Sequence, residues 1–334
     1  MPQISIAFQT NKTAQQYSTL AQQVNQYDFD VVSVYHDLPH HPSYAALLLM
    51  APHISKARIG PAAVSPFRTH PLDIAAQAAL LDQLAPGRTY IGMARGAWLE
   101  DHSVAVPAKP ISAMREAVDL TLAILRGEAG YRGERYRLAE HVSAPYALPE
   151  QVPPLMIGTW GRKLCALAGE IAHEVKIGGS ANPDVVPVIA DYIAVGEAKA
   201  GRESGSVSVV VGAVTVVDED REAARQAARR SVALYLPVVL PLDPTVQIDP
   251  ELVERIRQQV EAGDRDGAAA LISDDMLERF AFAGDRNDII RQCEALYDAG
   301  AGRVELGTPH GLDQPKGIDL IGQQVVPALK AHWR

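Results

Sequence analysis

The sequence predicts an α/β protein with the fold of a (β/α)8 barrel, the TIM barrel. Strand-like segments alternate with segments of helical periodicity along the 334 residues, which favours a mainly parallel sheet covered by helices. An open dinucleotide-binding sheet, the rival fold, expects Gly-x-Gly-x-x-Gly after its first strand, whereas Phe8-Gln9-Thr10-Asn11 follows here. Eight candidate strands interleave with the helices, and they span residues 3–8, 31–35, 57–64, 88–94, 155–159, 174–177, 207–217 and 303–306.

The segments between the strands have the pattern of amphipathic helices. Residues 72–84 carry apolar side chains at helical spacing, with Thr69 as the expected N-cap and Pro71 in the first turn. A second apolar stripe predicts a helix that ends at Gly127. A third helix is expected over residues 161–171.

One long segment interrupts this alternation. Residues 237–286 combine a proline-rich stretch over 237–244, expected to be a loop, with several short helical patterns. We therefore predict one domain over residues 1–334, with an insertion at about 237–286 between strands seven and eight, near the barrel mouth.

The composition narrows the choice of partners. The hydrophobic content of 47% suffices for one large core, and the formal net charge is −9. Because no basic cluster is longer than Arg229-Arg230, nucleic acid and anionic membrane surfaces are not expected as partners. The apolar runs are too short to span a bilayer, and the N-terminus lacks the pattern of a signal peptide. Cys165 and Cys293 are expected to be buried thiols of a cytoplasmic protein.

The active site of such a barrel lies at the carboxyl ends of its strands. The residues that follow the candidate strands are rich in glycine, aromatic and neutral hydrogen-bonding side chains. Paired carboxylates, which glycoside hydrolysis or a two-metal centre requires, are scarce among them. His36, His40 and His41 with Asp37 could form a metal site, but the neighbouring prolines favour a surface turn, so no metal is expected.

The start of the third predicted helix is a candidate anion site. Helix N-termini present free N–H groups and the positive end of the helix dipole, and Arg162 and Lys163 add two charges there. Gly178-Gly179, after the next strand, would let the backbone approach a ligand closely. The alternative is a solvated helix start with ordinary basic residues. Lys176, inside a strand, either reaches a bound anion or pairs with Glu174.

Short motifs match one known family in register from about residue 3 to residue 179. They comprise Phe29-Asp30, Ile59-Gly60-Pro61, Ser65-Pro66, His70-Pro71, Leu81-Asp82, Gly87-Arg88, Ile91-Gly92, Arg115-Glu116, Leu125-Arg126-Gly127-Glu128 and Leu167-Ala168-Gly169-Glu170. On these residues the chain resembles the bacterial luciferase-like superfamily of flavin- and deazaflavin-dependent enzymes. Within it, the chain is most similar to the branch that resembles methylenetetrahydromethanopterin reductase.

The resemblance implies a cofactor site at the barrel mouth. In the deazaflavin branch a non-prolyl cis peptide with a bulge in the third strand supports the back of the central ring, and this feature maps to Ala62-Ala63. Ser65 falls where the family places a hydrogen bond to the ring system. The phosphate-binding turn of the family matches Thr159, Trp160 and Gly161. Further cofactor contacts are expected from Arg95, Arg162, Gly178 and Gly179.

Departures from the family pattern bear on catalysis. The tetrahydromethanopterin reductases carry a glutamate at the end of the first strand, where this chain has Gln9, and an amide cannot protonate a substrate nitrogen. Related deazaflavin dehydrogenases carry an acid where this chain has Ala97-Trp98, and their Asp-His order after strand two is reversed here. The candidate catalytic residues are His36, Asp37, Gln9 and Glu100, of which His36 or Asp37 is expected to act as acid or base.

The resemblance implies an oxidoreductase that moves a hydride between a reduced deazaflavin, coenzyme F420, and a small organic substrate. An FMN-dependent luciferase-like monooxygenase is the alternative that keeps the fold and changes the reaction. A non-catalytic barrel that binds a phosphorylated ligand is the third interpretation. Relatives are usually dimers, so a homodimer is expected, whereas the identity of the substrate is not encoded in any recognisable motif.

Overall fold

The structure is a computed structural model that describes residues 2–247 and 249–332. Within these residues the main sheet has nine strands in the order β3-β2-β1-β11-β9-β8-β7-β4, with β10 paired to β9, and its strand pairs are parallel. Single bridges from Ile59 to Thr89 and from Val64 to Met93 close the ring between β3 and β4. The strands are β1 (Gln3–Phe8), β2 (Val31–Val34), β3 (Arg58–Pro61), β4 (Ile91–Ala94), β7 (Leu155–Gly158), β8 (Glu174–Gly178), β9 (Ser208–Val217), β10 (Ala281–Gly284) and β11 (Arg303–His310).

The predicted (β/α)8 barrel is confirmed, because each of the eight predicted strands corresponds to a strand of the closed ring. Strand β10 was not predicted. It lies within the expected insertion, and its four residues, Ala-Phe-Ala-Gly, are too few to show strand periodicity. Strand β8 pairs with the first half of β9 and β10 pairs with the last half. As a result, β8 ends at Gly178, short of the carboxyl ends of β9 and β10.

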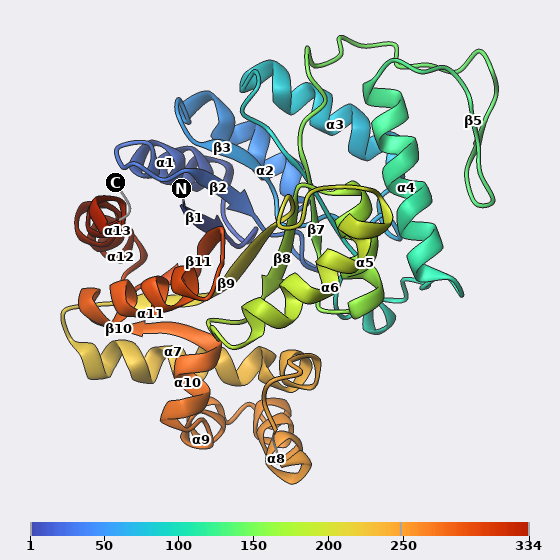
Figure 1. Cartoon of the computed structure of the whole chain (residues 1–334). Coiled ribbons are helices and arrows are strands. Elements are labelled where there is room, and N and C mark those ends of the chain that lie inside the picture. The colour runs from blue at the N-terminus through green and yellow to red at the C-terminus, as the bar shows by residue number, and fades with distance from the viewer. Residues whose placement is uncertain (1, 248, 333–334) are drawn as a thin grey trace.

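Helices follow the strands around the outside of the ring (Figure 1). The N-cap of α3 is His70, whose Nδ1 accepts a hydrogen bond from the N–H of Leu72 at 3.2 Å, so the expectation of Thr69 as the cap is wrong. The helices are α1 (Ala14–Val24), α2 (Ser43–Met50), α3 (Pro71–Leu84), α4 (Pro110–Leu125), α5 (Arg162–Ile171), α6 (Val185–Lys199), α7 (Arg221–Val239), α8 (Pro250–Glu261), α9 (Arg265–Ala270), α10 (Asp274–Phe280), α11 (Arg286–Asp298), α12 (Gln314–Leu320) and α13 (Val326–His332).

The expected loop over residues 237–244 is wrong in its first part. Helix α7 continues through Pro237 to Val239, because its buried face, which includes Leu236, stays packed in a hydrophobic cluster with α10 and β10. A short 3-10 turn, Leu240–Leu242, follows it. The remainder of the segment forms α8, α9, α10 and β10, and these helices gather on the same side of the barrel as α7 (Figure 1).

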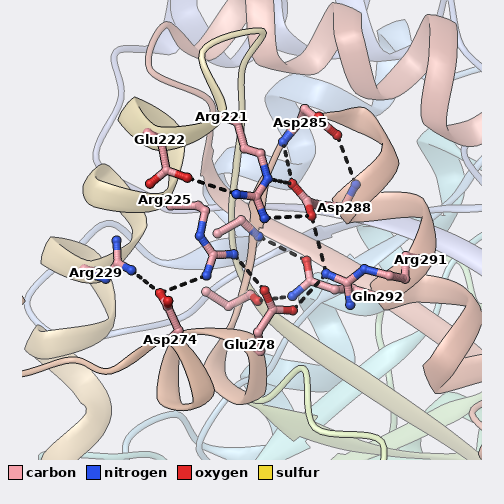
Figure 2. Close-up of polar contacts among 12 residues, drawn as sticks. Arg221, Glu222, Arg225, Arg229, Asp274, Glu278, Asp285, Asp288, Arg291 and Gln292 are labelled. Atoms are coloured by element: carbon pink, nitrogen blue, oxygen red, sulfur yellow. Dashed lines mark hydrogen bonds and ion pairs between the residues drawn. The ribbon is translucent and has the colours of Figure 1, made fainter.

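Ion pairs connect this segment to the helices of the barrel. Arg225 on α7 is buried, and its guanidinium donates to Asp274 at 3.0 Å and to Glu278 at 2.7 Å, both on α10. Glu278 also accepts a hydrogen bond from Arg291 on α11 at 3.0 Å. One carboxylate therefore joins three helices (Figure 2).

A two-stranded hairpin, β5 (Tyr131–Arg132) and β6 (Arg137–Leu138), stands outside the barrel beside α4 (Figure 1). The buried carboxylate of Glu116 on α4 holds its turn by accepting the backbone N–H of Tyr136 at 2.6 Å. The Tyr136 ring in turn packs edge-on against His70, with 5.3 Å between the ring centroids. The hairpin therefore braces the segment that joins β3 to α3.

The inside of the barrel carries charged side chains as well as apolar ones. Glu174 accepts hydrogen bonds from Arg58 at 2.5 Å and from the fully buried Arg303 at 2.6 Å. Lys176, two residues further along β8, pairs with Glu305 on β11. Of the two alternatives for Lys176, the pairing with Glu174 is therefore wrong, because two arginines pair with Glu174 and Lys176 pairs with Glu305.

Cys165 on α5 and Cys293 on α11 are buried free thiols, as their helical contexts predicted. Burial raises the pKa of Cys165 to about 12, so this thiol stays protonated near neutral pH. In the described part of the chain, no helix combines the length and the apolarity that crossing a membrane requires.

Candidate active site

The carboxyl ends of the strands form a mouth whose walls are poor in side chains. A Cβ atom added at Gly178, the last residue of β8, would have no heavy atom within 4 Å, so this wall faces open space. A Cβ at Gly158, the last residue of β7, would lie 3.1 Å from the Cβ of Ala94 and 3.9 Å from that of Ala63. Ala63, Ala94 and Gly158 thus form a surface without bulky groups, called the shelf below.

The peptide bond between Ala62 and Ala63, directly after β3, is cis. This is the geometry that the family resemblance implied at these two positions. Both alanines are half-buried and pack against a small apolar cluster that includes Tyr90 and Met156. Their part in supporting a cofactor ring stays a prediction.

Ser65 joins the ends of β3 and β4. Its buried hydroxyl donates to the carbonyl oxygen of Arg95 at 2.5 Å and accepts the N–H of Phe67 at 3.3 Å. One lone pair of the hydroxyl oxygen is left for the ring contact that the resemblance implies. Arg95 itself is exposed. The cofactor contacts expected from Ser65 and Arg95 both stay predictions.

The turn between β7 and α5 has the geometry of an anion site. Thr159 Oγ1 accepts the N–H of Gly161 at 3.0 Å, and Trp160 Nε1 donates to the carbonyl oxygen of Gly178 at 3.2 Å. Gly161 is the N-cap of α5, and no side chain caps this helix. The first N–H groups of α5 therefore stay available to a ligand. Arg162, in the first turn, is exposed, and its guanidinium lies 5.7 Å from the ring centroid of Tyr192 on α6.

The backbone at Gly179 lies against the C-terminal end of α7. Its φ of +79° lies in the left-handed region that favours glycine, and its N–H donates to the carbonyl oxygen of Gly212 at 2.7 Å. A Cβ at Gly179 would lie 2.9 Å from Val239 Cγ2 and 3.3 Å from the Tyr235 ring. The end of α7 thus forms a wall of the mouth next to β8, and a phosphate contact at Gly178 and Gly179 stays a prediction.

His36 points out of the barrel, toward the N-terminus of α2. Its Nδ1 accepts the N–H of Ser43 at 3.1 Å. Burial, with a smaller contribution from the charge of Arg68, lowers the pKa of His36 to about 4. The ring is therefore neutral near pH 7 and carries its proton on Nε2. It lines an open cavity of about 320 Å³ together with Arg68, Asp73 and other residues of α3 and the segment before it.

The other candidate catalytic residues differ in their surroundings. Asp37 is half-buried on the segment after β2. Gln9, at the end of β1, is also half-buried, and its Nε2 lies 3.1 Å from His40 Nδ1. Glu100 is exposed on a 3-10 turn after β4. In the part of the chain that the structure describes, no hydrogen bond joins any two of the candidates, and their catalytic roles stay predictions.

The histidines after β2 do not gather around one point. His40 lies against Gln9, His36 against Ser43, and His41 Nδ1 is 3.4 Å from the Tyr17 hydroxyl. Among residues 2–247 and 249–332, no group of three or more His, Cys, Asp or Glu side chains is placed to hold a metal ion. Each histidine of this segment is therefore held by its own protein contact.

Sequence reasoning missed Tyr35, which reaches into the barrel. A Cβ at Gly307 on β11 would collide with its hydroxyl, and Nζ of Lys176 on β8 lies 4.9 Å from its ring centroid. Because Tyr35 directly follows β2, contacts with β11 and β8 place its ring inside the mouth. Side-chain alternation could have found it. Ser33 donates to Glu305 inside the barrel, and a residue two positions further faces the same way.

A closed parallel barrel of this kind defines the TIM-barrel class, in which binding sites lie at the carboxyl ends of the strands. The family model described as luciferase-like monooxygenase matches residues 3–303. The chain therefore belongs to the luciferase-like monooxygenase family, in agreement with the motifs in its first 179 residues.

Several similar relatives are named F420-dependent enzymes or methylenetetrahydromethanopterin reductases. The 5,10-methylenetetrahydromethanopterin reductase of Methanopyrus kandleri is 31% identical over 308 residues, which cover 86% of this chain and 87% of the relative. That of Archaeoglobus fulgidus is 30% identical over 297 residues, with the same coverage of 86% and 87%. The F420-dependent glucose-6-phosphate dehydrogenase of Microbacterium testaceum is 24% identical over 311 residues, covering 89% and 86%.

One solved structure supports the same grouping, and a second shares the fold. The coenzyme F420 dependent tetrahydromethanopterin reductase from Methanopyrus kandleri superposes with a TM-score of 0.89 at 27% identity, covering 98% of this chain and 99% of that one. An F420-dependent secondary alcohol dehydrogenase in complex with an F420-acetone adduct superposes with a TM-score of 0.80 at 20% identity, covering 98% and 99%. The second likeness shows the fold alone.

Proposed function

We propose that this protein is an oxidoreductase that uses coenzyme F420 to move a hydride to or from a small organic substrate. The observation that carries the proposal is the shelf of Ala63, Ala94 and Gly158, which continues through Thr159 to the uncapped start of α5. A deazaflavin combines a flat ring system with a phosphate-bearing tail, and these two parts of the mouth match its two parts. The relatives named as F420-dependent support the choice of cofactor.

The residues present fit such a group. A side chain at Gly158 would fill the space over Ala63 and Ala94 where the ring would lie. The N–H groups at the start of α5, with the charges of Arg162 and Lys163, would hold the phosphate. When bound, the cofactor supplies the redox chemistry, as a donor or acceptor of hydride.

The remaining walls would position the substrate and exclude water. Trp160 and the end of α7 border the shelf on the side of β8, so they would hold a small molecule against the ring. We propose His36 or Asp37 as the acid or base of the reaction, with Gln9 and Glu100 as further candidates. His36 is a neutral ring that lines the cavity beside Arg68 and α3, so it would serve only a substrate that extends into this cavity.

Titration of the purified protein with F420, FMN and the nicotinamide cofactors tests the proposal. We expect F420 to bind at least tenfold more tightly than the others, with ΔG differing by about 1.4 kcal/mol or more. An FMN-dependent monooxygenase, which the family name favours, would instead bind FMN more tightly and consume oxygen. Binding of none of them would refute both.

Turnover is then measured with a panel taken from the named activities of the relatives. Reduced F420 is offered with methylenetetrahydromethanopterin and with acetone, and oxidised F420 with glucose 6-phosphate and with propan-2-ol. Absorbance of the cofactor reports turnover in each case. The proposal of a homodimer rests on the family resemblance, and that of a cytoplasmic location on the two free thiols. Size-exclusion chromatography with light scattering tests the dimer.

A further inference from the structure

Tyr35 forms the floor of one half of the mouth. The shelf lies over β3, β4 and β7, whereas Tyr35 extends from the end of β2 to Gly307 on β11. In the order of the barrel, β1 stands between these two strands, so the ring of Tyr35 crosses the half made by β2, β1 and β11. If a cofactor ring lies on the shelf, this is the half in which a substrate would meet it.

The hydroxyl of Tyr35 is available to a ligand. The hydroxyl has no hydrogen-bond partner among the described residues. It is also not among the side-chain polar atoms that lack a partner and are closed off from solvent. Tyr90, deeper in the same barrel, differs, because its hydroxyl donates to the carbonyl oxygen of Gly60 and lies 2.9 Å from Ser33 Oγ. Because no protein group takes up its hydrogen-bonding capacity, the Tyr35 hydroxyl can donate to a ligand bound in the mouth.

Two charged residues hold the Tyr35 ring in place. Nζ of Lys176 lies over the ring, 4.9 Å from its centroid, and the same ammonium pairs with Glu305. Glu305 is fixed in turn by Ser33, which donates to it at 2.6 Å. Burial, and then the charge of Glu305, raise the pKa of Tyr35 well above its usual value. The phenol therefore keeps its proton at neutral pH and can act as a donor.

We propose that Tyr35 is a further catalytic residue, whose hydroxyl hydrogen-bonds to the carbonyl oxygen or imine nitrogen of the substrate and protonates it. This inference rests on the proposed hydride transfer. In the reducing direction a C–H bond forms between the hydride and the substrate carbon, and the π electrons of the C=O or C=N bond take the Tyr35 proton. The O–H bond of Tyr35 breaks, leaving a phenolate beside the Lys176 ammonium, and water returns the proton after product leaves.

The position of Gln9 supports this assignment. Gln9 directly follows β1, which lies between β2 and β11, so it borders the same half of the mouth as Tyr35. An amide cannot give up a proton to a substrate heteroatom, whereas a phenol can. Of these two residues in the same half of the mouth, Tyr35 is therefore the one that can act as an acid.

The test compares Tyr35→Phe with Tyr44→Phe in the full-length protein. Tyr44 on α2 offers a matched control, because its hydroxyl has no partner among residues 2–247 and 249–332 and is closed off from solvent, so a ligand in the mouth cannot contact it. Loss of a general acid lowers kcat by about 10²- to 10⁴-fold. We expect a loss of this size for Tyr35→Phe with whichever panel compound the wild-type protein turns over, and none for Tyr44→Phe.

Two readouts separate catalysis from structure. We expect the F420 dissociation constant and the midpoint of thermal unfolding of Tyr35→Phe to match those of the wild type, because the hydroxyl has no protein partner to lose. A kcat for Tyr35→Phe within about threefold of the wild type would overturn the assignment. A wild-type protein that binds F420 but turns over no panel compound would instead count against the hydride transfer itself, and the assignment would fall with it.

Discussion

Lys176 on β8 and Glu305 on β11 form an ion pair inside the barrel, with side chains that are 7% and 0% exposed. Each charge depends on the other, because little water reaches either of them. We expect Lys176→Met to lower the free energy of unfolding by about 3–5 kcal/mol, since it leaves the buried carboxylate of Glu305 with only Ser33 and a longer contact to Arg303 at 3.5 Å. Urea denaturation followed by circular dichroism measures this loss.

Lys199→Met is the matched control. Lys199 pairs with Glu170 at 2.8 Å, but its side chain is 69% exposed, and exposed pairs contribute about 0–1 kcal/mol. The double variant Lys176→Met with Glu305→Gln removes both charges and should regain part of the loss. Equal effects of the two lysine substitutions would show that the interior pair is not needed for stability.

Arg225 makes a second testable contribution, at the junction of α7 with α10 (Figure 2). We expect Arg225→Met to lower the free energy of unfolding by about 1–3 kcal/mol, because it removes charge-assisted hydrogen bonds to Asp274 and Glu278. This loss should be smaller than the one expected for Lys176→Met inside the barrel, since water still reaches both carboxylates. Thermal unfolding measures it against Arg230→Met, whose pair with Asp266 is exposed. Equally small shifts in the midpoint of thermal unfolding for Arg225→Met and Arg230→Met would contradict the expectation.

The barrel could be predicted because its signals are local. Each strand and helix shows its own periodicity over a few residues, and eight such repeats leave few folds to choose from. The partner of Lys176 could not be predicted, because Glu305 lies 129 positions further along the chain. The extension of α7 through Pro237 likewise depends on burial against α10 and β10, which the local pattern does not reveal.

The candidate site likewise has a part that the sequence could predict and a part that it could not. Ala63 and the turn from Thr159 to Gly161 belong to contiguous motifs, so the sequence indicated them. Ala94 and Gly158, the other residues of the shelf, were not among the predicted site residues. The part proposed for Tyr35 depends on Gly307 and Lys176, which come from strands far apart in the chain. The pattern after β2 drew attention to its histidines, whereas the phenol that faces the mouth carries no motif.

The start of α5 can be tested with Gly161→Glu. Gly161 has φ of −76° and ψ of 124°, which other residues adopt, and the nearest atom to an added Cβ is Thr159 Oγ1 at 3.7 Å. We expect the fold to persist and F420 affinity to fall at least tenfold, about 1.4 kcal/mol, because a carboxylate would stand where the phosphate is proposed to bind. Fluorescence titration measures the affinity.

Ala198→Glu adds the same charge at an exposed position near the end of α6 and serves as the control. This variant should leave F420 affinity within about twofold of the wild type, since position 198 lies at the C-terminal end of α6, where the helix dipole does not attract an anion. Unchanged affinity in Gly161→Glu, with the protein folded, would refute the phosphate assignment.

His36 predicts a pH dependence of stability. Its pKa falls from 6.5 to about 4 in the folded protein, mainly through burial. As the pH drops below about 6.5 the unfolded chain takes up a proton on this ring, whereas the folded protein does so only near pH 4. The folded state therefore loses stability between these two values. His36→Asn removes this titration, while its Oδ1 can still accept the N–H of Ser43.

We expect the loss of unfolding free energy between about pH 7 and pH 4 to be about 1–3 kcal/mol smaller in His36→Asn than in the wild type. Urea denaturation at several pH values measures it. The buried His310, whose pKa burial also lowers, is present in both proteins, so its contribution cancels in the comparison. His102→Asn, at an exposed position, is the control and should follow the wild type. If His36→Asn loses as much stability as the wild type on acidification, the ring of His36 is not held neutral by burial.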